Sequence, residues 1–234
     1  WKDYNAYSDF ISSEGAPVFY ARVDHVSVPL DKEGTGQVVV DFTPEPLTQD
    51  VSFAFHIEKT AGVVVDSLTA EISGVPSTME LTTGLILAQK TYKLLFRPAY
   101  AALPSAADST STEALRCEAA VNIPGIVRSH TEDMVTGPGI LQIAIYTHYD
   151  YEEEGTQRKA AKVFHAGINL YHTLKECKSL QWDEEAGGYR QASRSITVEI
   201  GTPLEIDKDG ILNSGSTSTG LDQWIPGETF EIEV

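Results

Sequence analysis

The sequence predicts an all-β fold. In residues 51–57 (VSFAFHI) apolar side chains occupy every second position, so Phe53 and Phe55 are expected in a core. Similar segments recur along the chain between short turns, and no long stretch has the period of a helix. Short strands separated by turns indicate a sandwich or barrel and not alternating strands and helices.

Turns divide the first half of the chain into its expected strands. Residues 31–34 (DKEG), 43–46 (TPEP) and 73–76 (SGVP) contain Gly, Pro and Asp, which favour turn geometry. The strands expected around these turns are residues 22–30, 37–42, 50–59, 63–72, 78–81 and 90–96.

A change of composition follows. Residues 98–111 are mostly Pro, Ala, Ser and Thr, which is typical of a linker or an exposed loop. We therefore expect a domain boundary near residue 105, with one sandwich in residues 1–105 and a second in residues 106–234. Limited proteolysis is expected to cut first between residues 98 and 112, because such a segment has few apolar side chains to dock.

The second half again contains alternating strands. Residues 150–155 (DYEEEG) are expected at a hairpin tip, whereas residues 169–179 suit either a short helix or a strand. The expected strands have apolar side chains at every second position within residues 115–123, 141–145, 196–200 and 230–234.

Charge and composition exclude several classes of partner. The chain has 17 Lys and Arg against 34 Asp and Glu, and the net charge of −17 repels nucleic acid. No apolar run reaches the roughly 20 residues that span a bilayer as a helix. The chain begins at Trp1 and not at a methionine, which suggests a processed or excerpted chain. A disulfide between Cys117 and Cys177 and two free thiols are both compatible with the sequence.

No residue pattern predicts catalysis, a cofactor or a metal ion. The six histidines lack the spacing of a metal motif, and no serine lies in a G-x-S-x-G elbow. Residues 205–210 (EIDKDG) resemble the first half of a calcium loop, but Ser216 stands where that loop needs a carboxylate. We expect an Asp-Gly turn there, and chelator is expected to leave the melting temperature unchanged.

Three aromatic side chains lie among polar residues and glycines: Trp182, Tyr189 and Trp224. Exposed aromatic rings can stack on sugars, so these residues form a candidate carbohydrate-binding surface. We favour a structural interpretation, in which Trp182 and Tyr189 pack across a hairpin and Trp224 plugs one end of the second sandwich.

Two stretches of the chain carry a family resemblance. The first is residues 47–57 (LTQDVSFAFHI), which continues through residues 68–75 and 79–84 (MELTTG). The second is residues 195–204, followed by residues 220–234 with GLDQW, GE and a final FEIEV. Together these stretches resemble the fimbrillin and fimbrial-anchor family of Bacteroidales type V pili. The resemblance implies two tandem β-sandwiches of transthyretin-like topology. It also implies export to the outer-membrane surface or fimbrium of a Gram-negative bacterium, with membrane attachment only through a lipid anchor outside this chain.

The expected function is therefore non-enzymatic: a fimbrial anchor, pilus subunit or adhesin that contacts other subunits and a host or bacterial surface ligand. The alternative is a surface glycan-binding protein on the same scaffold, and a secreted hydrolase is a distant third option. In residues 229–234 the apolar side chains Phe230, Ile232 and Val234 alternate with glutamates, as β-augmentation of a neighbouring subunit requires. We expect instead that the strand stays in its own sandwich with the three apolar side chains buried.

Overall fold

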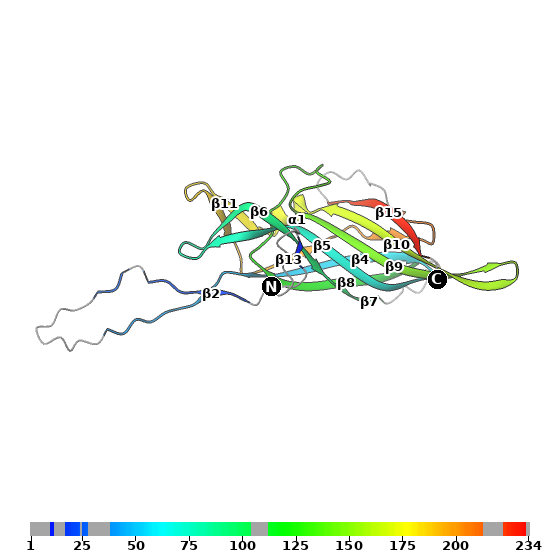
Figure 1. Cartoon of the computed structure of the whole chain (residues 1–234), viewed down its shortest axis with the longest axis horizontal. Helices are drawn as coiled ribbons and strands as arrows, with labels where there is room; N and C mark the ends of the chain where they lie inside the picture. The colour runs from blue at the N-terminus through cyan, green and yellow to red at the C-terminus, as the bar shows by residue number, and fades with distance from the viewer. Residues whose placement is uncertain are drawn as a thin grey trace, which may run out of the picture.

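A computed structural model describes residues 10–11, 17–23, 25–27, 38–103, 112–212 and 222–232 of the 234-residue chain. The fold is all-β, as predicted, with fifteen strands and one short helix among these residues. Most strands belong to two sheets, and a two-stranded ribbon of β2 (Phe19–Tyr20) and β3 (Glu45–Pro46) projects from the body (Figure 1).

The larger sheet has eight strands, seven of which lie in the order β11-β12-β6-β5-β9-β10-β15. Its eighth strand, β1 (Phe10–Ile11), pairs in parallel with β6. A hairpin therefore forms one edge of the sheet and the last strand forms the other. The bounds are β11 (Leu180–Asp183), β12 (Gly188–Gln191), β6 (Leu85–Phe96), β5 (Val63–Glu80), β9 (Ile140–Glu153), β10 (Thr156–Asn169) and β15 (Trp224–Ile232).

The smaller sheet has five strands. β4 (Gln49–Thr60) pairs along its full length with antiparallel β8 (Thr112–Ile123), which pairs in turn with β7 (Ala99–Ala102). On its other side β4 pairs in parallel with β13 (Ser195–Glu199) and β14 (Leu204–Ile206). β4 is thus the central strand of this sheet.

The core lies between the two sheets. Phe53 and Phe55 of β4 are each 1% exposed, which confirms the alternation predicted for this strand. The ring of Phe53 stacks on Phe96 of β6 with 5.0 Å between centroids, and Phe55 meets the edge of Trp224 on β15 at 5.8 Å. These contacts join the smaller sheet to strands of the larger one, so the two sheets pack face to face as a sandwich.

The strands are not divided at residue 105 in the way the sequence analysis expected. β4, from the first half, pairs with β8, β13 and β14 from the second, and β5 pairs with β9. One hydrophobic cluster also contains side chains from both halves. The alternation of apolar residues shows which side chains face a core, but it carries no information on which strands are neighbours. The transthyretin-like topology stays a prediction.

The turn predicted at residues 73–76 was wrong, because these residues lie in a bulged part of a strand. β5 continues through residues 73–76, with register shifts between Ile72 and Val75 and between Pro76 and Thr78. Gly74 has φ +90°, and a Cβ there would lie 2.5 Å from the carbonyl oxygen of Val127, so only glycine fits.

In the expected linker, residues 99–102 form β7, and residues 104–111 lie outside the described residues. Strands were also expected at residues 22–30 and 37–42. The residues of these two ranges that the structure describes are not in strands.

Residues 169–179, whose sequence suits either a helix or a strand, contain the helix α1 (Tyr171–Glu176). The carboxylate of Asp222 accepts hydrogen bonds from the backbone N–H groups of His172 (3.0 Å) and Thr173 (2.9 Å), which otherwise have no partner in a first helical turn.

Among the described residues there is no helix with the length and apolar composition needed to cross a membrane. The hairpin expected at 150–155 is confirmed by the pairing of β9 with β10.

Candidate functional site

The β11–β12 hairpin presents Trp182 at one edge of the larger sheet. Trp182 and Tyr189 are directly opposite in the ladder, and their rings meet edge to face at 5.0 Å. The predicted packing across a hairpin is thus confirmed. Trp182 nevertheless stays 55% exposed, so part of its indole remains available to a ligand.

Asp183 holds the hairpin turn. One carboxylate oxygen accepts a hydrogen bond from Nε of Arg190 at 2.7 Å, and the other accepts one from the backbone N–H of Ala186 at 3.0 Å. Both bonds stabilise the ionised carboxylate, and that from Arg190 contributes most to lowering the pKa of Asp183 below its ordinary value. The turn is therefore supported by a charged side chain at neutral pH.

Trp224 has a different environment. It is 2% exposed, and its indole Nε1 donates a hydrogen bond to the carbonyl oxygen of Thr202 at 2.9 Å. This confirms the prediction that Trp224 is packed inside the protein. It lies on β15, at the opposite edge of the sheet from β11, so the three aromatic residues do not form one surface (Figure 1).

Two surface hollows meet at the hairpin aromatics. Their volumes are about 370 Å³ and 490 Å³, and both are lined by Trp182, Tyr189 and His130. The β6 residues that line the larger hollow are uncharged: Ile86, Leu87, Ala88 and Thr91. Trp182 therefore stands between two concave surfaces, which is where a stacked sugar ring would have room for its neighbours.

The smaller of these hollows is basic. Arg128, His130, Lys175 and Lys178 line it together with the two aromatic rings, and none of its lining residues is Asp or Glu. We call this hollow the basic groove. Sequence reasoning missed it, because Arg128 comes from the loop after β8 whereas the lysines lie in and just after α1. No local signal in the sequence could have found it, since Lys178 follows the end of α1 and does not continue the helical spacing from Lys175.

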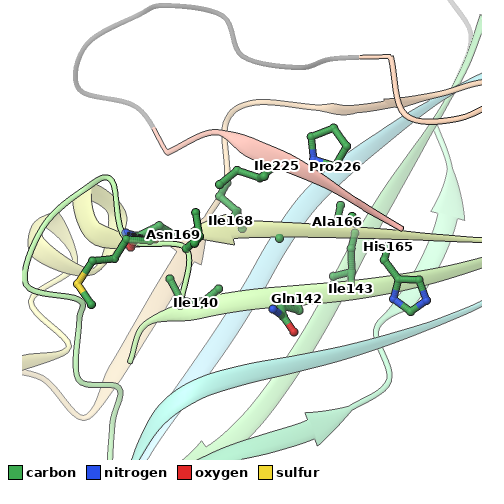
Figure 2. A pocket seen from close by; sticks show the side chains of 13 residues that line it. Ile140, Gln142, Ile143, His165, Ala166, Ile168, Asn169, Ile225 and Pro226 are labelled. Carbon is green, nitrogen blue, oxygen red and sulfur yellow. Dashed lines mark hydrogen bonds between the residues drawn. The ribbon is translucent and has the colours of Figure 1, made fainter. Parts of the chain in front are cut away.

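A third hollow, of about 220 Å³, lies over β9, β10 and the start of β15. Figure 2 shows Gln142, His165 and Asn169 on β9 and β10, with Ile225 and Pro226 on β15. Both polar atoms of the Asn169 side chain have hydrogen-bond partners. Its amide nitrogen donates hydrogen bonds to three carbonyl oxygens of residues 131–134, and its amide oxygen accepts one from the hydroxyl of Ser129. It anchors a loop and is not directed at a ligand.

A bulge decides which side of β15 carries Phe230. Two steps along β10, from Phe164 to Ala166, are matched by three along β15, from Pro226 to Thr229. Beyond this point the two faces of β15 are exchanged, since successive side chains alternate. Phe230 consequently lies on the outer face and is 51% exposed, so the expectation that it is buried was wrong.

The rest of the candidate assembly strand follows the same register. The ring of Phe230 meets His165 edge to face at 5.6 Å, on the outer surface of the sheet. Ile232 pairs with Ala161 in the ladder, so the strand is paired with β10 of its own chain in this structure. Val234 lies outside the described residues.

The cysteines are free thiols in the structure. Cys117 is buried in the core, and this burial raises its pKa to about 12. Burial also raises the pKa of Cys177 above its ordinary value. A thiol in this state is a poor nucleophile at neutral pH, because the thiolate is the reactive form.

The segment that resembles a calcium loop is a turn. The carboxylate of Asp207 accepts hydrogen bonds from the backbone N–H groups of Asp209 (2.7 Å) and Gly210 (2.8 Å). This is the local side-chain bonding that defines an Asx turn. Within the described part of the chain, no group of three or more His, Cys, Asp or Glu residues is arranged to hold a metal ion.

Comparison of the chain with known protein families, with curated proteins and with solved structures found no match. The two edges of the larger sheet differ in what they expose. One edge carries the exposed Trp182 and the basic groove, and the other carries the exposed strand β15.

Proposed function

We propose that this chain is a non-enzymatic surface protein of a Gram-negative bacterium that acts as a fimbrial anchor, pilus subunit or adhesin. The proposal is supported by the resemblance to fimbrillins and fimbrial anchors of residues 47–57, 68–75, 79–84, 195–204 and 220–234. The structural observation that carries it is the exposed edge strand β15, whose residues 225–231 are all exposed.

An edge strand of this kind suits subunit assembly. β15 pairs with β10 on one side, and no other described strand pairs with it, so backbone groups on its free side are open to a further strand. Phe230 adds a large exposed apolar side chain on the outer face. Pro226, Glu228 and Glu231 would limit indiscriminate pairing, since proline lacks an N–H donor and like charges repel.

Fractionation of the producing bacterium tests this proposal. The chain is expected in the material sheared from the cell surface together with other fimbrial subunits. A Phe230→Asp variant made at the same level should be depleted from that fraction. The matched control is Leu81→Asp, because Leu81 is 63% exposed in the turn between β5 and β6. Retention of the chain inside the cell, or equal incorporation of both variants, would contradict the proposal.

A second candidate function is surface glycan binding, and the 55% exposure of Trp182 between two hollows favours it. A glycan array is expected to show binding by the intact chain that Trp182→Ala abolishes. Tyr151→Ala is the control, because Tyr151 is an exposed aromatic residue on β9, outside both hollows. No binding to any glycan, or equal loss in both variants, would rule this function out.

A further inference from the structure

The charge of the basic groove is opposite to that of the chain. Acidic residues outnumber Lys and Arg by 34 to 17, yet the groove is lined by Arg128, Lys175, Lys178 and His130 and by no carboxylate. Surface positions filled in proportion to composition would place more acids than bases around such a hollow. The groove is therefore a local site of positive potential, which attracts anionic ligands.

The fold does not neutralise this charge. Lys175 and Lys178 are exposed, and neither makes an ion pair with any residue that the structure describes. The guanidinium of Arg128 lies over the ring of Tyr171, 5.1 Å from its centroid, which fixes the side chain while leaving its charge unpaired within the described residues. Three cationic groups are thus available to a ligand.

The backbone at Lys178 gives an independent indication. This residue follows the end of α1 with φ +54°, in the left-handed region where glycine or asparagine is favoured after a helix. A lysine at this position costs backbone free energy that glycine would avoid. Strained backbone is often retained where the side chain has a functional role, and the side chain of Lys178 lines the groove.

The groove combines these cations with an aromatic face. A simple anion would need no indole beside it, and a neutral sugar would need no unpaired lysines. From the geometry we infer that the basic groove binds an acidic saccharide. A carboxylate or sulfate group contacts Arg128, Lys175 and Lys178, and a sugar ring stacks on Trp182. This inference rests on the second candidate function and specifies its ligand class.

A nucleic acid also combines rings with negative charge. However, its regular phosphates extend beyond a single groove and would meet the negative potential of a chain with net charge −17. A saccharide with one acidic group for each sugar or pair of sugars has a lower charge density and keeps its charge within the groove. The observations therefore favour the acidic saccharide.

Calorimetric titration of the intact chain tests the inference with four probes: a heparin-derived tetrasaccharide, tetragalacturonate, neutral galactotetraose and a single-stranded octanucleotide. At least one acidic saccharide should bind about tenfold or more tightly than the neutral one, and added salt should weaken that binding. If the neutral saccharide binds equally well, the inference fails while glycan binding stands. If no saccharide binds, both fail, and tighter binding of the oligonucleotide also overturns the inference.

Variants separate a binding role from a structural one. Lys178→Gly should lower the affinity for the acidic probe about tenfold without lowering the melting temperature, since glycine suits the left-handed backbone. Lys159→Gln is the control, because Lys159 is exposed on β10 outside the groove. If Lys178→Gly binds the acidic probe as tightly as the unchanged chain, Lys178 does not contact the acidic group and the inference is wrong.

Discussion

The two edges of the larger sheet each carry a tryptophan, and the two have opposite environments. Trp182 on β11 is 55% exposed, whereas Trp224 on β15 is 2% exposed. Both lie among polar residues in the sequence. The difference shows that local composition does not decide whether such a residue is structural. What decides it is whether the side chain points between the sheets or toward solvent.

The contacts of the two residues explain the difference. Trp224 points inward, meets Phe55 of the smaller sheet and has a carbonyl partner for its indole N–H. Trp182 belongs to a hairpin that joins the rest of the sheet through the pairing of Tyr189 with Ile86. Trp224 therefore contributes to the free energy of folding, whereas Trp182 is available to a ligand.

The largest expected effect is on stability. Trp224→Ala should reduce the free energy of unfolding by about 3 to 5 kcal/mol, because it leaves a cavity between the sheets. Trp182→Ala should change it by less than about 1 kcal/mol. Urea unfolding followed by circular dichroism measures both values, and similar losses in the two variants would remove the distinction between the edges.

A smaller difference is expected between two phenylalanines. Phe55→Ala should cost about 3 to 5 kcal/mol, since its ring is 1% exposed. Phe230→Ala should cost about 1 kcal/mol, because half of its surface is already in water. The denaturant midpoints of the two variants measure this difference in stability. A loss at Phe230 as large as that at Phe55 would show that the bulge does not place Phe230 outside.

The smallest effect concerns pH and the hairpin turn. The pKa of Asp183 is lowered in the folded state, chiefly by its bond from Arg190. The contribution of this carboxylate is therefore present above the ordinary pKa of about 3.9 and is lost as pH falls through the lower folded value. Amide hydrogen exchange in β12 should accelerate relative to the core strands in that acid range. Asp183→Asn should remove this pH dependence, and an unchanged profile would contradict the assignment.

Much of the fold was predictable because alternation is a local property. The strand containing Phe53 and Phe55 and the hairpin between Trp182 and Tyr189 follow from side-chain periodicity and from the turn residues between them. The side of the sheet on which Phe230 lies could not be predicted in this way, because one extra residue in a bulge exchanges the faces of all later residues in the strand. Gly74 was misassigned for a related reason, since a glycine in a bulge resembles a glycine in a turn.

The candidate site was predictable only in part. Trp182 and Tyr189 could be identified as aromatic residues beside a turn. Their separation from Trp224 in space depends on which strands are neighbours in the sheet. The basic groove depends on tertiary structure, because Arg128 and Lys178 are 50 positions apart in the sequence. No local pattern predicts that these two side chains line the same hollow.

The most direct test of the distinction between the two edges is an NMR titration of the intact, isotope-labelled chain with the acidic saccharide that binds in calorimetry. The indole N–H signals of the tryptophans are resolved separately and are assigned with Trp182→Phe and Trp224→Phe variants. The signal of Trp182 should shift progressively with saccharide concentration, while that of Trp224 stays in place and exchanges slowly with solvent. A shift at Trp224 without one at Trp182 would contradict the assignment of saccharide binding to Trp182 and of structural packing to Trp224.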